Sequence, residues 1–184
     1  DKVFFKGELV AEKGKPLFEA KAKFDSSVLN TVKIKDVKPQ DFEIYSKSDN
    51  VNTIRLIPVN VVTEKDIRKI KRNSDKSVNL EGTDILKLAV VERHNNTGNI
   101  GKALIQNYGL KNGAIAQTVA HDSHNIIVLG DNNEDMAAAV NGLRDLGGGL
   151  IVVSKGKVLG SLKLEVAGLM TAEPIDKVNE QFQN

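Results

Sequence analysis

The chain has 184 residues, with Lys+Arg 26 against Asp+Glu 24, no Cys and only 4% aromatic residues. The nearly even charge argues against a nucleic-acid partner, and the absence of Cys excludes disulfide scaffolds, thiolate metal sites and cysteine nucleophiles. No apolar run of the sequence approaches the roughly 18 residues that cross a bilayer, so we expect no membrane partner and a cytoplasmic location.

The first third of the chain is typical of short strands. Residues 3–10 and 16–24 are expected to flank a hairpin turn at Gly14, which can adopt the positive φ that such a turn requires. Residues 54–62 are rich in β-branched side chains, and Pro58 within them indicates an edge strand or a bulge.

Charge is concentrated in residues 64–76, where acidic residues alternate with Lys and Arg and no aromatic residue occurs. This mixture favours a solvated hairpin or a frayed helix over a nucleic-acid surface.

From residue 83 onward the patterns are clearer. Residues 85–91 form a nearly continuous apolar run, which is typical of a strand covered on both faces. Ile100, Leu104 and Tyr108 are spaced by four, which predicts a helix over 99–108. Further strands are expected at 114–120, 126–129, 150–153 and 158–166.

Two more helices are expected in the second half of the chain. One is capped by Asp131 or Asn132 and ends at Gly147, and the other begins near Pro174. Together the elements predict an α+β fold. Residues 1–82 are expected to form a mostly-β lead segment, and residues 83–184 an α+β domain of mixed strands with two or three helices.

A polar cluster interrupts two apolar strands in the second half of the chain. It consists of His121, Asp122, Ser123, His124 and Asn125. Such a turn places polar groups at the end of a sheet, where functional sites are commonly built. An Asx-type turn whose side chains bond their own backbone explains the same residues equally well.

Glu92, Arg93 and His94 form a second polar strand end, after the run 85–91. The alternative for these residues is a strand end that simply reaches solvent.

As a metal site the cluster offers two ligands, His121 and His124, and a third would have to come from Asp122 or His94. A Ser-His-Asp triad is a weaker interpretation, because residues adjacent in sequence rarely form the required chain of hydrogen bonds.

Several stretches resemble the C-terminal region of bacterial adenine deaminases. They are residues 84–87, 91–94, 98–101, 113–116, 119–126, 133–136, 147–150 and 167–170. Residues 30–32 and 41–42 also resemble the family's stretch that follows its barrel. The most specific combination is the cluster 121–125 followed by the strand that begins with three Gly residues at 147–149. The likeness covers essentially the whole chain.

The resemblance implies a hydrolase of the amidohydrolase superfamily that converts adenine and water to hypoxanthine and ammonia in purine salvage. In that family a divalent metal, manganese or iron, is held in a (β/α)8 barrel and activates the water. This chain has three His, no His-x-His pair and no eight-fold βα alternation. We therefore expect the barrel and its metal to lie outside this chain, which is expected to be a C-terminal piece that is inactive in isolation.

On this interpretation the lead segment completes the β layer that flanks the barrel. The cluster 121–125, together with Arg93 and His94, supplies the candidates for shaping or covering the active site. The expected partners are adenine, the barrel and further copies in a homo-oligomer. Two alternatives stay open: a non-catalytic oligomerisation or structural domain, and a small metal hydrolase that uses His121 and His124.

Overall fold

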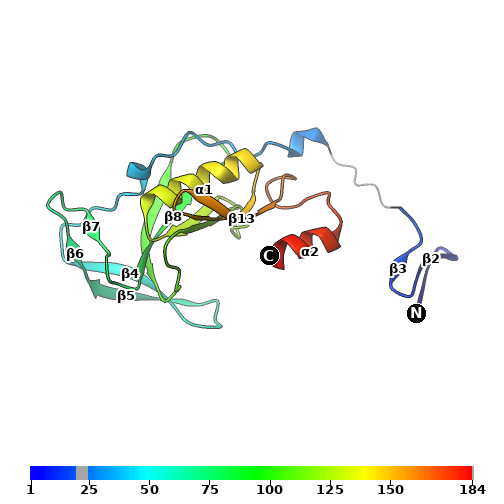
Figure 1. Cartoon of the computed structure of the whole chain (residues 1–184), viewed down its shortest axis with the longest axis horizontal. Helices are drawn as coiled ribbons and strands as arrows, with labels where there is room; N and C mark the ends of the chain where they lie inside the picture. Colours follow the sequence, from blue (N-terminus) through cyan, green and yellow to red (C-terminus); the bar gives the residue numbers. More distant parts are fainter. Residues whose placement is uncertain (20–24, 184) are drawn as a thin grey trace.

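The computed structural model describes residues 1–19 and 25–183. Its main body is one eight-stranded sheet in the order β13-β12-β10-β11-β8-β9-β4-β5 (Figure 1). The strands are β4 (Asn50–Leu56), β5 (Thr63–Lys69), β8 (Ile85–Val91), β9 (Ile100–Gln106), β10 (Ala114–Gln117), β11 (Ile126–Gly130), β12 (Gly149–Ser154) and β13 (Lys157–Lys163).

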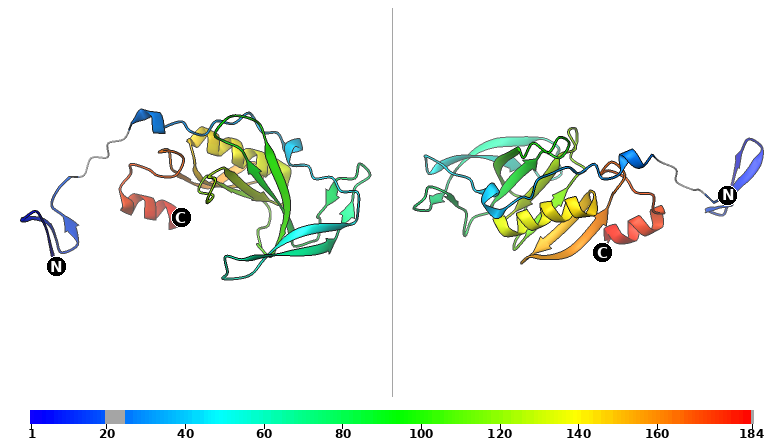
Figure 2. Two further views of the ribbon diagram at one scale, coloured as in Figure 1. Left: turned by 180° about the vertical axis from the view of Figure 1, so that it is seen from behind. Right: turned by 90° about the horizontal axis from the view of Figure 1, so that it is seen from above.

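Neighbouring strands of this sheet run antiparallel, except that β4 pairs with β9 in parallel. The β4–β5 pair and β13 form its opposite edges (Figure 2). Two α-helices accompany the strands, α1 (Asn133–Leu146) and α2 (Ile175–Gln183). The described residues thus confirm an α+β fold, and they contain no closed barrel.

A small hairpin sheet forms the N-terminal end, with β1 (Lys2–Phe5), β2 (Glu8–Glu12) and β3 (Lys15–Pro16). The turn at Gly14 is confirmed, with φ of +75°. The expected strand 3–10 is instead two strands, because Gly7 adopts a φ of +83° and reverses the chain. The expected strand 16–24 shows only Pro16 in β3, and its residues 20–24 lie outside the described residues.

The expected helix over 99–108 is wrong, because these residues form β9, which pairs with β8 along its whole length. A spacing of four residues places side chains on one face of a helix, but it also places them on one face of a strand. Ile100 and Leu104 fit both patterns. The neighbouring strand decided between them.

The charged residues 64–76 form β5 and the short strand β6 (Lys71–Arg72), which pairs with β7 (Val78–Asn79). The solvated-hairpin interpretation is therefore confirmed over the frayed helix. β4 ends at Leu56, so Pro58 lies in the connection to β5 rather than within a strand. Ion pairs such as Arg68–Asp84, at 3.0 Å, tie the charged strand to its surroundings.

Helix α1 begins and ends as the sequence predicts. The side chain of Asn132 caps it by accepting a hydrogen bond from the backbone N–H of Asp135 at 2.8 Å. Gly147 ends it in the left-handed conformation, with φ of +82°. The C-terminal α2 also forms where expected, directly after Pro174. Within residues 1–19 and 25–183, no helix is long and apolar enough to span a membrane.

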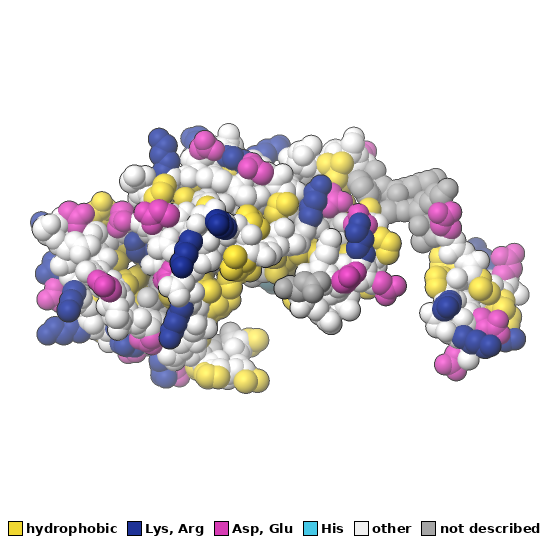
Figure 3. All heavy atoms as spheres, viewed as in Figure 1, with side chains coloured by type: hydrophobic (Ala, Val, Ile, Leu, Met, Phe, Trp, Pro, Cys, Tyr) yellow, Lys and Arg dark blue, Asp and Glu magenta, His cyan; other side chains and the backbone are white. Residues whose placement is uncertain are grey.

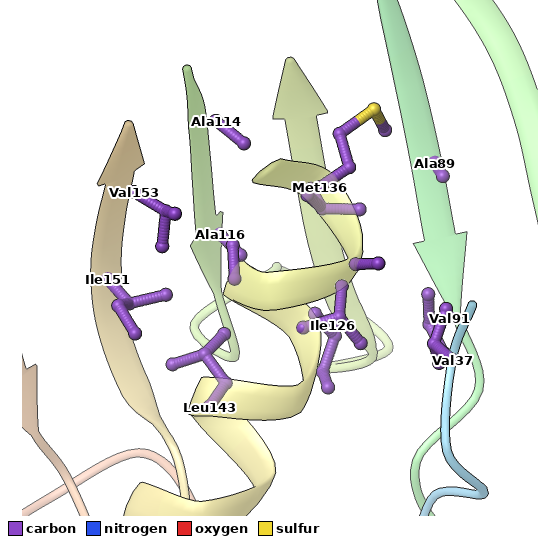
Figure 4. Packing of buried hydrophobic residues seen from close by; sticks show 14 of the residues in the cluster. Val37, Ala89, Val91, Ala114, Ala116, Ile126, Met136, Leu143, Ile151 and Val153 are labelled. Carbon is purple, nitrogen blue, oxygen red and sulfur yellow. The ribbon is translucent and has the colours of Figure 1, made fainter. Parts of the chain in front are cut away.

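The main core lies between α1 and one face of the sheet (Figure 4). Because successive side chains of a strand point to opposite faces, every second residue of β8, β10, β11 and β12 faces this helix. The most deeply buried members are Ala114, Ala116, Ile126, Val128, Met136, Ala139, Val140 and Leu143.

One part of the lead segment completes this core, while Ile70 and Val78 belong to a second cluster that they form with residues of β8 and β9. Val32, Val37 and Phe42, the last within the 3-10 helix η2 (Pro39–Phe42), are buried in the same cluster. Asn141 of α1 fixes the segment by accepting from the N–H of Val37 at 3.1 Å and donating to its carbonyl at 2.8 Å. A second 3-10 helix, η1 (Ser26–Val28), precedes it. The division of the chain at residue 82 stays a prediction, while β4 and β5 extend the common sheet.

Candidate functional site

The two polar strand ends that the sequence indicated meet at one end of the central strands of the sheet. β8 and β11 are antiparallel neighbours, and Val91 at the end of β8 pairs with Ile126 at the start of β11. The segment after β8 and the cluster before β11 must therefore lie side by side. A contact of 2.9 Å between His94 Nε2 and the carbonyl oxygen of Ser123 joins them. We call residues 121–125 the polar turn.

Arg93 anchors the polar turn from the protein interior. Its side chain is 2% exposed, and its Nε donates to the carbonyl oxygen of His124. The two terminal nitrogens donate to Thr31 Oγ1 at 3.2 Å and to the carbonyl oxygen of Ala167 at 3.1 Å. Burial lowers the pKa of Arg93, but a guanidinium group stays protonated in proteins at neutral pH. One buried cation thus holds together three segments that are far apart in sequence.

Two contacts at Gly168 complete this anchor. Gly168 has a φ of +70°, and a Cβ at this position would lie 2.9 Å from Arg93 Nη1, so a larger residue would displace the guanidinium. The carbonyl oxygen of Gly168 accepts a hydrogen bond of 2.5 Å from Thr118, which is fully buried at the end of β10. The polar turn is therefore anchored by Arg93, which follows β8, and Gly168 links this anchor to Thr118 at the end of β10.

Glu92 organises the neighbouring loop. Its carboxylate accepts hydrogen bonds from the backbone N–H groups of Asn95 at 2.8 Å and Thr97 at 3.1 Å, and from Thr97 Oγ1 at 2.9 Å. The N–H of His94 also points to this carboxylate. These bonds, that from Thr97 above all, lower the pKa of Glu92 to about 2.

The low pKa of Glu92 predicts an acid-sensitive loop. Because the folded value lies below the ordinary carboxyl value, the stabilisation is complete above about pH 5 and is lost as pH falls from there towards 2. We expect the hydrogen-exchange protection factors of the Asn95 and Thr97 amides to fall over this range. In Glu92→Gln the same amides are expected to be less protected at pH 6 and insensitive to acid. Identical pH profiles in the two proteins would contradict this role.

The tip of the polar turn is exposed to solvent. The side chains of His121 and Asp122 are 87% and 88% exposed, and His121 Nδ1 contacts the Asp122 carboxylate. His124 is half-buried, and its Nδ1 has no hydrogen-bond partner among the described residues. Exposed polar side chains on a turn whose backbone is held by hydrogen bonds are available to contact a ligand.

The two interpretations of the turn apply to different residues. Ser123 and Asn125 behave as a local turn predicts, since Ser123 Oγ accepts from the N–H of Asn125 at 3.4 Å. The Asn125 side chain also accepts from the N–H of Arg93 at 3.3 Å, which links it to the anchor. Backbone bonding does not account for His121 and Asp122, which project into solvent.

The geometry does not favour a metal site at the polar turn. The rings of His121 and His124 meet edge to face, with centroids 5.9 Å apart. Across residues 1–19 and 25–183, no group of three or more His, Cys, Asp and Glu side chains is placed to hold an ion. The described residues therefore do not fit the divalent metal that the resemblance implies, and we derive no step of the chemistry through it.

A buried polar group that no motif indicated lies at the other end of the sheet. Lys87 Nζ donates to Asn133 Oδ1 at 2.7 Å and lies 3.6 Å from Glu43 Oε2, while Asn133 donates to the same carboxylate. Burial lowers the pKa of Lys87. The three residues line a cavity of about 850 Å³. The one sequence signal for it is a lysine inside the apolar run 85–91.

Comparison with known proteins gives a consistent family. The family model described as "Adenine deaminase C-terminal domain" matches residues 60–184. "Adenine deaminase 2" of Carboxydothermus hydrogenoformans is 48% identical over 181 residues, which are 98% of this chain and 32% of the relative. "Adenine deaminase" of one Dehalococcoides mccartyi strain is 44% identical over 184 residues, 100% of this chain and 32% of the relative.

A relative from a third organism has the same name. "Adenine deaminase" of Clostridium acetobutylicum is 42% identical over 177 residues, which are 95% of this chain and 31% of the relative. The chain therefore spans about a third of the length of the curated relatives it matches.

Proposed function

Because the chain belongs to the adenine deaminase C-terminal domain family, we propose that it is the C-terminal portion of an adenine deaminase, a hydrolase that converts adenine and water to hypoxanthine and ammonia. The polar turn is its contribution to the active site, which the remaining part of the longer enzyme completes. A divalent metal, manganese or iron, held by that part, a cytoplasmic location in purine salvage and a homo-oligomeric assembly belong to the same proposal.

The observation that carries this proposal is the contrast between the support of the polar turn and its tip. The buried Arg93 donates to the carbonyl oxygen of His124 within the turn, and the buried Thr118, three residues before the turn, donates to the carbonyl oxygen of Gly168. His121 and Asp122 are nevertheless almost fully exposed. A turn that is rigid in its backbone and free in its side chains is suited to positioning polar groups against a small ligand.

The chemistry of the two side chains matches a purine. The Asp122 carboxylate only accepts hydrogen bonds when ionised, so it suits a ring N–H of adenine. The His121 imidazole can donate to a ring nitrogen that carries a lone pair. Two such contacts orient the ring and exclude water from one side of it. The proton transfers and the attacking water remain with the part of the enzyme outside this chain.

Kinetics of the longer enzyme test this role. We expect His121→Ala to lower kcat/KM for adenine by about tenfold, since one hydrogen bond to a ligand contributes roughly 0.5–1.5 kcal/mol. Asp122→Asn keeps the size of the side chain and removes its charge, and a similar loss is expected. The matched control is Lys111→Ala, because Lys111 is exposed and lies beside the cavity at the other end of the sheet. This substitution should leave kcat and KM unchanged.

Unchanged kcat and KM in both variants of the polar turn would leave it with a folding role only, and the proposal would fail. Thermal unfolding of each variant separates an effect on substrate from an effect on stability. Because His121 and Asp122 are exposed, neither substitution should lower the melting temperature appreciably.

A further inference from the structure

The sheet has a second apolar face, and no helix among the described residues covers it in full. Strand register places alternate residues of the central strands on the side away from α1. One row across the sheet pairs Val152, Ile115, Leu129 and Leu88, and the next pairs Leu150, Gln117, Ile127 and Val90. Except for Gln117, each of these positions carries a branched aliphatic side chain.

The middle of this face remains accessible to solvent. Leu129 is buried in a cluster with Leu86 and Ile105, against which side chains of β4 and Leu110 pack. The other aliphatic side chains of the two rows are half-buried or exposed, and Val90 is 37% exposed. We call this set the open face: Leu88, Val90, Ile115, Ile127, Leu150 and Val152. A contiguous patch of exposed aliphatic side chains commonly marks a surface that binds another protein segment.

Apolar groups also project at both borders of the open face. At the β13 edge, Phe182 of α2 and Leu159 line a groove of about 320 Å³, together with Leu150 and Val152 of the open face. The side chains of Phe182 and Leu159 are each more than half exposed. At the other edge, the connection from β4 to β5 exposes Val59 almost completely. Figure 3 shows hydrophobic side chains gathered on this projecting tip.

We infer that the open face is the docking surface for the part of the longer adenine deaminase polypeptide that this chain does not contain. The inference rests on the proposed function and names the surface that brings the polar turn to its substrate. The relatives are about three times as long as the segment they share with this chain, so a large body is available to cover it.

The position of the polar turn supports this occupant. Val90 and Ile127 pair directly with each other, one residue from the strand ends that carry Arg93 and the polar turn. A body seated on the open face therefore reaches the exposed side chains of His121 and Asp122 at its border. The docking surface and the proposed substrate contact are continuous.

A second copy of this chain is a poorer occupant through the β13 edge. Antiparallel pairing of two β13 strands about Gly160 would place Lys157 of each copy opposite Lys163 of the other. Like charges that face each other directly across a strand pair are destabilising, and edge lysines are a common protection against such pairing.

Cysteine labelling tests the inference, because this chain has no Cys of its own. Val90→Cys and Leu159→Cys are made separately in the 184-residue chain and in the longer enzyme, with Asp145→Cys on α1 as the exposed control. Maleimide labelling is then read peptide by peptide by mass spectrometry. We expect labelling at positions 90 and 159 to be at least tenfold slower in the longer enzyme, with no change at position 145.

Two results would overturn the inference. One is equal labelling of position 90 in the isolated chain and in the longer enzyme. The other is concentration-dependent protection in the isolated chain together with a light-scattering mass of two chains, which would assign the open face to a second copy. Kinetics keep this separate from the proposed function: a loss of activity in His121→Ala with equal labelling would retain the role of the polar turn and reject the docking surface.

Discussion

Replacing Arg93 with methionine is expected to lower the free energy of unfolding by about 3 kcal/mol or more, because three oxygen acceptors lose their donor in a buried site. The acceptors are the carbonyl oxygens of His124 and Ala167 and the hydroxyl oxygen of Thr31. Methionine fills much of the volume of arginine, so the effect reports hydrogen bonding more than packing. Urea denaturation of the two proteins measures the difference.

The matched control is Arg55→Met. Arg55 forms an ion pair with Glu64, and both side chains are 46% exposed. An exposed pair of this kind contributes about 1 kcal/mol or less, so the control should unfold close to the wild-type midpoint. A comparable loss in both variants would show that Arg93 is no more important than a surface arginine. Arg93→Lys should be intermediate, since a single ammonium group does not reproduce the planar fork of three contacts.

Replacing Gly149 with alanine is expected to have the largest effect of any single methyl group in the chain, above about 4 kcal/mol, and to prevent recovery of folded protein. Gly149 has a φ of +128°, and an added Cβ would overlap the carbonyl oxygen of Leu162 on β13. The carbonyl oxygen of Gly149 accepts hydrogen bonds from the N–H of Thr118 at 3.0 Å and from its Oγ1 at 3.3 Å, and the N–H of Gly149 donates to Thr118 Oγ1 at 2.8 Å. Circular dichroism and the soluble yield measure the outcome.

Gly160→Ala is the natural comparison for this substitution. It lies on the adjacent strand β13, and an added Cβ at this position meets no atom within 4 Å. We expect it to fold and to unfold within about 1 kcal/mol of the wild type. Normal folding of Gly149→Ala would mean that β12 and β13 can separate at little cost, which the buried neighbours of Gly149 argue against.

The parts of the fold that the sequence predicted correctly are those with local causes. The cap at Asn132, the stop at Gly147 and the apolar run 85–91 each depend on a few adjacent residues, and each is found where expected. The strand β9 was missed because its spacing of apolar residues also fits a helix. Pairing with β8, a contact between separate segments, decided the outcome. Local patterns do not contain that information.

The candidate site divides in the same way. The polar turn was identifiable because its residues are consecutive, and so was the strand end at Arg93. The role of Arg93 as a buried anchor was not predictable, since its acceptors are 31, 62 and 74 residues away along the chain. The grouping of Lys87 with Glu43 and Asn133 was hidden for the same reason, since the amide lies 46 positions after the lysine along the chain.

The path of residues 31–43 across α1 sets a lower limit on how far the chain can be shortened. Thr31 accepts a hydrogen bond from Arg93, and Val37 and Phe42 fill the core beneath the helix. The segment matched by the family model begins only at residue 60. Recombinant versions trimmed to the segment that the family model matches would therefore lack one wall of their own interior.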